Sequence, residues 1–110
     1  MDVTLTSVGY SYMIGDFDAA IKEASEALTN QKLKQKYRDF LESYLIRSTV
    51  LGNPDLTRNE LELMLNKMSI SDLSLAEKTK SVSIALYDLT IAHQSNDYFE
   101  ELENKFKYQQ

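Results

Sequence analysis

The spacing of the apolar residues is the feature that most constrains the fold of this chain. Apolar residues recur every three or four positions along almost the whole length, and no stretch shows the strict alternation of a half-buried strand. Three glycines and one proline among 110 residues also leave few breaks for hairpin turns. Long helices fit both observations, so we predict an all-α fold.

The periodic segments divide into six predicted helices. Their approximate ranges are 3–14, 17–29, 32–51, 57–68, 74–94 and 97–108. Gly15 and Asp16 separate the first two helices, and Asp16 can accept backbone N–H groups as an N-cap. Residues 52–54, Gly-Asn-Pro, end the third helix. Two Ser/Thr-x-x-Glu sequences, 57–60 and 74–77, predict capping boxes at the starts of the fourth and fifth helices. Because the connections are short, we expect three antiparallel hairpins.

Composition limits what such a chain can do. A length of 110 residues fits one domain, which we place at 1–110 and which could be a fragment of a longer chain. Twelve basic and seventeen acidic residues give a net charge of −5, which counts against direct contact with nucleic acid or an anionic membrane. The absence of cysteine excludes disulfides, thiolate zinc sites and cysteine nucleophiles. No signal peptide and no long apolar span is visible, so we expect a soluble, cytoplasmic protein.

The first and last helix breaks share a sequence pattern. The first consists of Leu5, Val8, Tyr12, Gly15, Asp16 and Phe17, and the last of Leu86, Leu89, His93, Asn96, Asp97 and Tyr98. Each residue of the second set follows its counterpart by 81 positions, as from 17 to 98. The hairpins are therefore predicted to be related but unequal in length. His93 takes the place of Tyr12, so we interpret it as a packing residue in preference to a base or metal ligand.

Residues 8–28, VGYSYMIGDFDAAIKEASEAL, resemble one tetratricopeptide repeat (TPR). The matching positions are Val8-Gly9, Tyr12, Gly15-Asp16-Phe17, Ala20-Ile21 and Ala27-Leu28. The chain departs from the family pattern in three ways: one residue is missing between Tyr12 and Gly15, position 24 is an alanine, and no proline stands near 32. The resemblance implies a right-handed α-solenoid in which stacked hairpins share one core, and the first helix of each pair lines a concave surface.

Uneven TPR-like hairpins in an acidic chain also resemble a second family. These are the C-terminal sensor domains of peptide-pheromone-responsive transcription regulators of Gram-positive bacteria. There, an N-terminal helix-turn-helix reads DNA, and the helical repeats bind a short peptide and dimerise. No helix-turn-helix is visible here, so the resemblance implies the sensor part of such a bacterial regulator.

The TPR-matched positions and the shift of 81 predict a binding surface for a peptide or protein segment. TPR-matched positions place Tyr10 and Met13 on the inner wall, and Tyr44 and Arg47 of the third helix are placed toward the same groove. The predicted binding residues are Tyr10, Met13, Tyr44, Arg47, Tyr87 and Gln94, with Arg47 available to a ligand carboxylate. Tyrosines at helical spacing are also common as half-buried core residues, and that alternative stays open for each of them.

The fifth predicted helix carries two apolar stripes, although one packed face needs only one. The first stripe consists of Leu75, Thr79, Val82, Leu86, Leu89 and His93, and the second of Ile84, Tyr87 and Ile91. The second stripe must face another helix, a partner chain or a ligand. The alternative prediction is therefore a homodimer interface formed by Ile84, Ile91, Phe99 and Phe106.

No set of residues suggests catalysis. The chain has one histidine, no glycine-rich loop and no serine in a nucleophile motif. Asp16, Asp18 and Glu100 lie at predicted helix starts, where carboxylates cap the helix and interact with its dipole. We therefore expect a non-catalytic binding module without a metal or cofactor.

Overall fold

The structure is a computed structural model that describes residues 2–94 and 103. The helices in this part are α1 (Asp2–Met13), α2 (Phe17–Leu28), α3 (Gln35–Gly52), α4 (Arg58–Asn66) and α5 (Leu73–Gln94). No strand occurs among the described residues, which confirms the all-α prediction for this part of the chain. The predicted sixth helix, 97–108, lies outside the described residues except for position 103 and stays a prediction.

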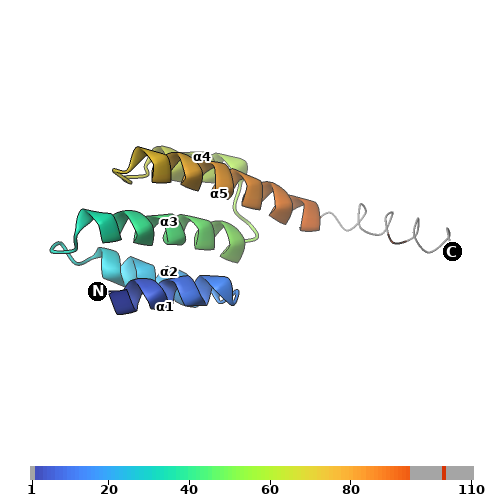
Figure 1. Cartoon of the computed structure of the whole chain (residues 1–110). Coiled ribbons are helices and arrows are strands. Elements are labelled where there is room, and N and C mark those ends of the chain that lie inside the picture. Colours follow the sequence, from blue (N-terminus) through green and yellow to red (C-terminus); the bar gives the residue numbers. More distant parts are fainter. Residues whose placement is uncertain (1, 95–102, 104–110) are drawn as a thin grey trace.

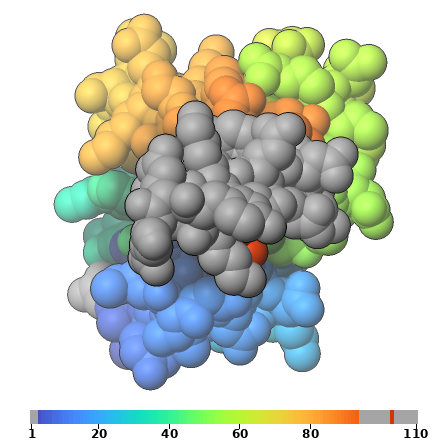
Figure 2. Space-filling model, turned by 90° about the vertical axis from the view of Figure 1, so that its right-hand side faces the viewer, coloured from blue at the N-terminus to red at the C-terminus, as the bar shows by residue number. Residues whose placement is uncertain are grey.

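Helix α3 lies at the centre of the described part. It contacts α1 and α2 on one side and α4 and α5 on the other (Figure 1). Figure 2, which looks at the molecule from the right-hand side of Figure 1, shows the α1–α2 hairpin at one edge and α4 and α5 at the opposite edge. Helices α1, α3 and α5 therefore follow one another side by side, with α3 in contact with both of the others.

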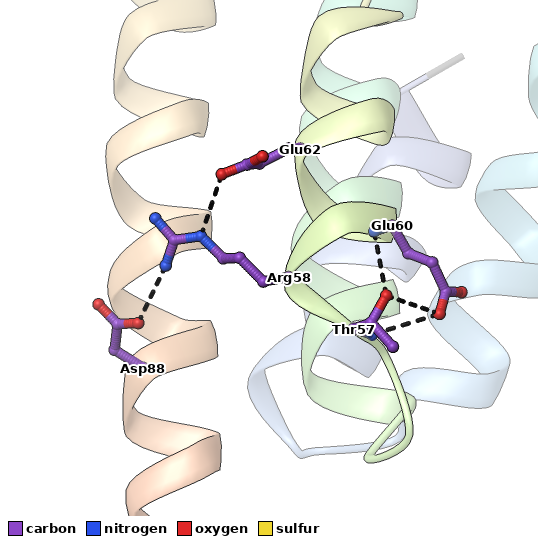
Figure 3. A network of polar contacts seen from close by, with 5 residues as sticks. All are labelled: Thr57, Arg58, Glu60, Glu62 and Asp88. Carbon is purple, nitrogen blue, oxygen red and sulfur yellow. Dashed lines mark hydrogen bonds and ion pairs between the residues drawn. The ribbon is translucent and has the colours of Figure 1, made fainter.

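Two predicted helix starts are confirmed. Gly15 adopts a positive φ of 83°, which glycine tolerates at a helix break, and the Asp16 carboxylate accepts the Ala19 N–H at 3.2 Å. At α4, Thr57 Oγ1 accepts the Glu60 N–H at 3.1 Å, and Glu60 Oε1 accepts the Thr57 N–H at 3.4 Å (Figure 3). The capping box predicted at 57–60 is therefore present.

The capping box predicted at 74–77 is wrong. Helix α5 begins at Leu73, and Asp72 caps it by accepting the Leu75 N–H on its carboxylate at 3.1 Å. The Asp72 N–H itself donates to the Asp39 carboxylate at 3.2 Å, which fixes the entry of the chain into the helix. An ionised carboxylate accepts a backbone N–H more strongly than a hydroxyl does, so Asp72 takes the capping position ahead of Ser74.

The third helix begins three residues later than predicted. The Asn30 side chain accepts the Lys32 N–H at 3.0 Å, an Asx-type turn that competes with helix formation. Lys34 is extended, with φ −63° and ψ 142°, and the helix starts at Gln35. Leu33 within this connection is buried, so the turn carries a core residue between α2 and α3.

The core consists of two apolar clusters, one on each side of α3. The first contains Val8, Ala20, Ala24, Leu33 and Leu41, and the second Ile46, Val50, Leu56, Leu61 and Leu65. Leu5 and Tyr12 of α1 pack against the first cluster beside the buried Val8. Because α3 contributes residues to both clusters, it connects the two halves of the described fold.

Two carboxylates of α3 hold the connection between α4 and α5, residues 67–72. The buried Asp39 carboxylate accepts hydrogen bonds from Gln35 Nε2, Ser71 N and Ser71 Oγ in addition to that from Asp72 N. Glu42 accepts the N–H and the hydroxyl of Ser69, at 3.0 Å and 2.8 Å. These bonds determine where α5 starts relative to α3.

Asp39 makes the stability of the fold depend on pH. Burial by itself raises the pKa of Asp39, but the hydrogen bonds from Gln35, Ser71 and Asp72 outweigh it and hold the pKa below its ordinary value of 3.8. A carboxyl group whose pKa is lower in the folded state contributes stability above its unfolded pKa and loses that contribution as the pH falls. We therefore expect the difference in unfolding free energy between the parent chain and Asp39→Asn to shrink below about pH 4.

Urea unfolding followed by circular dichroism from pH 7 to pH 3 measures this difference. The two chains differ only at position 39, so the comparison isolates the contribution of this carboxyl group. A difference that stays constant over this range would contradict the assignment to Asp39.

Candidate binding cleft between α3 and α5

A cleft of about 240 Å³ lies between α3 and α5. Its lining residues are Phe40, Ser43, Tyr44 and Arg47 from α3, and Leu75, Lys78, Thr79 and Val82 from α5. In each wall, the second, third and fourth residues follow the first by three, four and seven positions. This spacing places all four side chains on one face of their helix. The two walls are related by a shift of 35 positions, as from 40 to 75. The α3–α5 cleft is thus built from equivalent strips of two neighbouring helices.

Arg47 is held in place by two aromatic rings. Its Cζ lies 4.6 Å from the centroid of the Tyr44 ring and 4.9 Å from that of Tyr12, and the two rings meet edge-on at 5.6 Å. Its Nε also donates to the Ser43 carbonyl oxygen at 3.3 Å. A guanidinium stacked on aromatic faces loses less conformational freedom when it binds a ligand. Arg47 therefore presents a pre-oriented positive charge at the cleft.

The charge on the cleft is positive, although the chain as a whole is acidic. Arg47 and Lys78 both line it, and none of its lining residues is an aspartate or glutamate. Within the part of the chain that the structure describes, the ion pairs are those of Arg58, and neither Arg47 nor Lys78 takes part in one. The α3–α5 cleft thus combines apolar walls with two cations that no described carboxylate neutralises.

Two hydroxyl groups join the walls of the cleft. The Ser43 and Thr79 oxygens lie 2.8 Å apart, and both residues are almost fully buried. Such small side chains allow α3 and α5 to approach closely, and their mutual hydrogen bond satisfies both polar groups. The volume of the cleft, below the roughly 300–1,000 Å³ of sites for drug-sized ligands, suits a single side chain with a neighbouring anionic group.

A polar network centred on Arg58 links the start of α4 to α5 (Figure 3). Arg58 Nη1 lies 3.3 Å from Asp88 Oδ1, and Arg58 Nε lies 3.4 Å from Glu62 Oε1. The Arg58 guanidinium also lies 6.0 Å from the centroid of the Tyr87 ring. Exposed ion pairs contribute about 0–1 kcal/mol each, so this network orients the two helices more than it stabilises them.

Of the six predicted binding residues, the structure brings together only Tyr44 and Arg47 in the cleft. Tyr10 and Met13 lie on the outward face of α1 and are exposed. Tyr87 packs against the second core cluster on the α4 side, and Gln94 is the last residue of α5. The predicted residues therefore do not form one continuous groove with the cleft.

The second apolar stripe of the fifth predicted helix packs mainly within the chain, against the second core cluster, to which α3 and α4 both contribute. Ile84 and Tyr87 pack against the cluster that includes Leu61 and Leu65, whereas Ile91 is exposed. Ile84 is thus already packed within one chain, while Phe99 and Phe106 of the alternative dimer interface lie outside the described residues. This arrangement accounts for most of the stripe without a partner chain.

Phe40, Lys78 and Val82 line the cleft but are not among the six predicted binding residues. The shift of 35 positions could have identified them, because it also relates the α3 wall to positions 5, 8, 9 and 12 of α1. There Gly9 lies against the Tyr44 ring, since a Cβ on Gly9 would be 3.2 Å from Tyr44 Oη, and Tyr12 contacts both Tyr44 and Arg47. Equivalent strips thus meet at both helix contacts of the α1–α3–α5 layer.

Comparisons of the chain with protein-family models, with curated proteins and with solved structures give no match. Within residues 2–94 and position 103, no cluster of three or more histidine, aspartate or glutamate side chains could hold a metal ion. In the same residues, no helix has the length and apolar character needed to cross a membrane.

Proposed function

We propose that this chain is a non-catalytic helical module that binds a peptide or protein segment through the α3–α5 cleft. The observation that carries the proposal is the pair of cations, Arg47 and Lys78, set beside apolar walls without a described carboxylate partner. A cation that is pre-oriented on two rings binds an anionic group at low entropic cost. The ligand would place one apolar side chain between Phe40 and Val82 and its anionic group at Arg47.

The proposal includes a TPR-like right-handed arrangement of hairpins. Its support is the side-by-side layer of α1, α3 and α5 and the 35-position shift between their contact strips, which is close to the 34-residue length of a TPR. Neighbouring repeats in such an array expose equivalent positions along one surface. The cleft between α3 and α5 would be one section of that surface.

The charge of the chain limits the kind of ligand. A net charge of −5 repels a strongly acidic segment at long range, whereas the two cations of the cleft attract one anionic group at short range. We therefore propose a segment that is apolar or basic overall and carries a carboxylate at the bound position. Its binding should weaken as salt is added.

Replacing Arg47 tests this proposal. Immobilised arrays of random octapeptides select binders for the parent chain, and titration of soluble copies gives their dissociation constants. We expect Arg47→Gln to weaken these peptides by about tenfold or more, because a hydrogen bond to a charged group contributes about 1.5–3 kcal/mol. Arg47→Lys keeps the positive charge but loses the planar guanidinium that stacks on the rings, so its affinity for these peptides should lie between those of the parent chain and Arg47→Gln.

Tyr87→Ala serves as the matched control, because Tyr87 packs on the α4 side, away from the cleft. Tyr87→Ala should leave the affinity of the selected peptides within about twofold, provided circular dichroism shows that the variant is folded. If the selected peptides bind the Arg47→Gln chain as tightly as the parent chain, the α3–α5 cleft is not the binding site.

A further inference from the structure

Gly9 lies in the interior of α1, where glycine is the poorest helix former after proline. Its backbone does not require glycine, because the positive φ among the three glycines of the chain belongs to Gly15. Gly9 is also buried, on the side of α1 that lies against α3 (Figure 1). A glycine that weakens its own helix without a conformational need is explained by the space that it leaves free.

The tip of the Tyr44 ring occupies the space beside Gly9. A Cβ on Gly9 would lie 3.2 Å from Tyr44 Oη and 3.4 Å from Tyr44 Cζ. Interiors are packed closely, so a methyl group at position 9 would require the Tyr44 ring or the whole of α1 to move by a few tenths of an ångström. The Tyr44 hydroxyl and the missing side chain of Gly9 therefore set how closely α1 and α3 approach at this point.

Neither movement would leave Arg47 as it is. The Tyr44 ring meets the Tyr12 ring edge-on at 5.6 Å, and Arg47 Cζ lies 4.6 Å from the Tyr44 centroid. If the Tyr44 ring swings away from position 9, it moves relative to both of these neighbours. If α1 moves away from α3 instead, it carries Tyr12, whose ring centroid lies 4.9 Å from Arg47 Cζ. Each movement displaces at least one of the two rings that hold the guanidinium.

We propose that Gly9 is a positioning residue of the α3–α5 cleft. By leaving room for the Tyr44 ring against α1, it fixes the direction in which Arg47 presents its charge. Tyr44 and Arg47 line the cleft and Gly9 does not, so Gly9 acts on the cleft through Tyr44. The expected effect on ligand affinity rests on the proposed function, whereas the effect on the orientation of Arg47 does not.

NMR spectra of the full chain without a ligand test the orientation of Arg47. Ring currents of the two tyrosines shift the Nε–H resonance of Arg47, which is assigned from its loss in Arg47→Gln. We expect Gly9→Ala to displace this resonance. Adding Gly9→Ala to Tyr44→Phe should leave the resonance where Tyr44→Phe alone places it, because phenylalanine keeps the ring and lacks the oxygen at 3.2 Å. Thr6→Ala, at an exposed position of α1, is the control and should not displace it.

Peptide titration measures the consequence for the cleft. For octapeptides selected on the parent chain, Gly9→Ala should raise the dissociation constant by about threefold to fivefold, the size of a cation–π contact at an exposed site. In the Tyr44→Phe background, the same change should leave the dissociation constant unaltered. Alanine favours a helix more than glycine does, so the weaker binding should not be accompanied by lower stability in urea unfolding.

An Arg47 resonance that is the same in Gly9→Ala and the parent chain would overturn the proposal. So would a resonance that Gly9→Ala displaces as far in the Tyr44→Phe background as in the parent. Octapeptides that are insensitive to Arg47→Gln would contradict the proposed function alone, because the resonance is measured without them. If circular dichroism shows that Gly9→Ala is unfolded, a folded Gly9→Ala/Tyr44→Phe chain supports the contact with Tyr44, and an unfolded one contradicts it.

Discussion

Replacing Asp39 by alanine is expected to lower the free energy of unfolding by about 3 kcal/mol at neutral pH. The carboxylate is buried in α3 and accepts hydrogen bonds from Gln35, Ser71 and Asp72, three of them from residues of the α4–α5 connection. Truncation leaves the N–H groups of Ser71 and Asp72 without this acceptor, and a hydrogen bond to a charged group contributes about 1.5–3 kcal/mol. Urea unfolding monitored by circular dichroism measures the loss.

Glu42→Ala and Asp55→Ala are the matched controls for this prediction. Glu42 accepts two hydrogen bonds from Ser69 but is only partly buried, so its loss should cost about 1 kcal/mol. Asp55 is exposed in the α3–α4 connection and should change stability by less than about 0.5 kcal/mol. If Asp39→Ala costs no more than Asp55→Ala, the carboxylate does not hold the connection in solution.

The consequences of Asp39 extend to the cleft. The α4–α5 connection determines where Leu75 and Lys78 lie relative to Phe40 and Arg47, and Asp39 is the main anchor of that connection. The Asp39→Ala chain should therefore bind selected peptides more weakly even under conditions where it is still folded. A side chain that touches no ligand would then affect binding through the position of α5.

The sequence predicted the local features of the fold well. Asp16 and Thr57 cap their helices as expected, because a cap depends on residues within one turn of the helix start. The start of α5 was predicted incorrectly because its cap, Asp72, is also held by Asp39 from more than thirty residues away. The residue pattern around the helix start cannot reveal a contact with a distant residue such as Asp39. That contact favours Asp72 over the neighbouring candidate Ser74 as the cap.

The candidate site was predicted less well than the fold. Tyr44 and Arg47 were identified because they follow the spacing of α3 itself, whereas Tyr87 came from a shift of 81 positions. The shift of 81 selects the face of α5 that packs on the second core cluster, while a shift of 35 selects the face that lines the cleft. The rotation of α5 about its axis depends on the contact between Ser43 and Thr79 and on the α4–α5 connection, and neither is visible in helical spacing.

Replacing Leu41 by alanine should lower the free energy of unfolding by about 4 kcal/mol, near the upper end of the range for buried leucines. Leu41 has no exposed surface and lies in the first core cluster together with Ala20 and Ala24. Those alanines have no side-chain atoms that could move into the space left behind, and the cost of a cavity is largest where the surroundings cannot collapse. Urea unfolding of the full chain measures the change.

Leu63→Ala makes the same chemical change at a leucine of α4 that is 56% exposed, and it should cost less than about 0.5 kcal/mol beyond the small difference in helix propensity. Comparing Leu41→Ala with Leu63→Ala therefore separates the effect of burial from that of the leucine-to-alanine change itself. Equal losses at positions 41 and 63 would contradict the position assigned to α3 at the centre of the core.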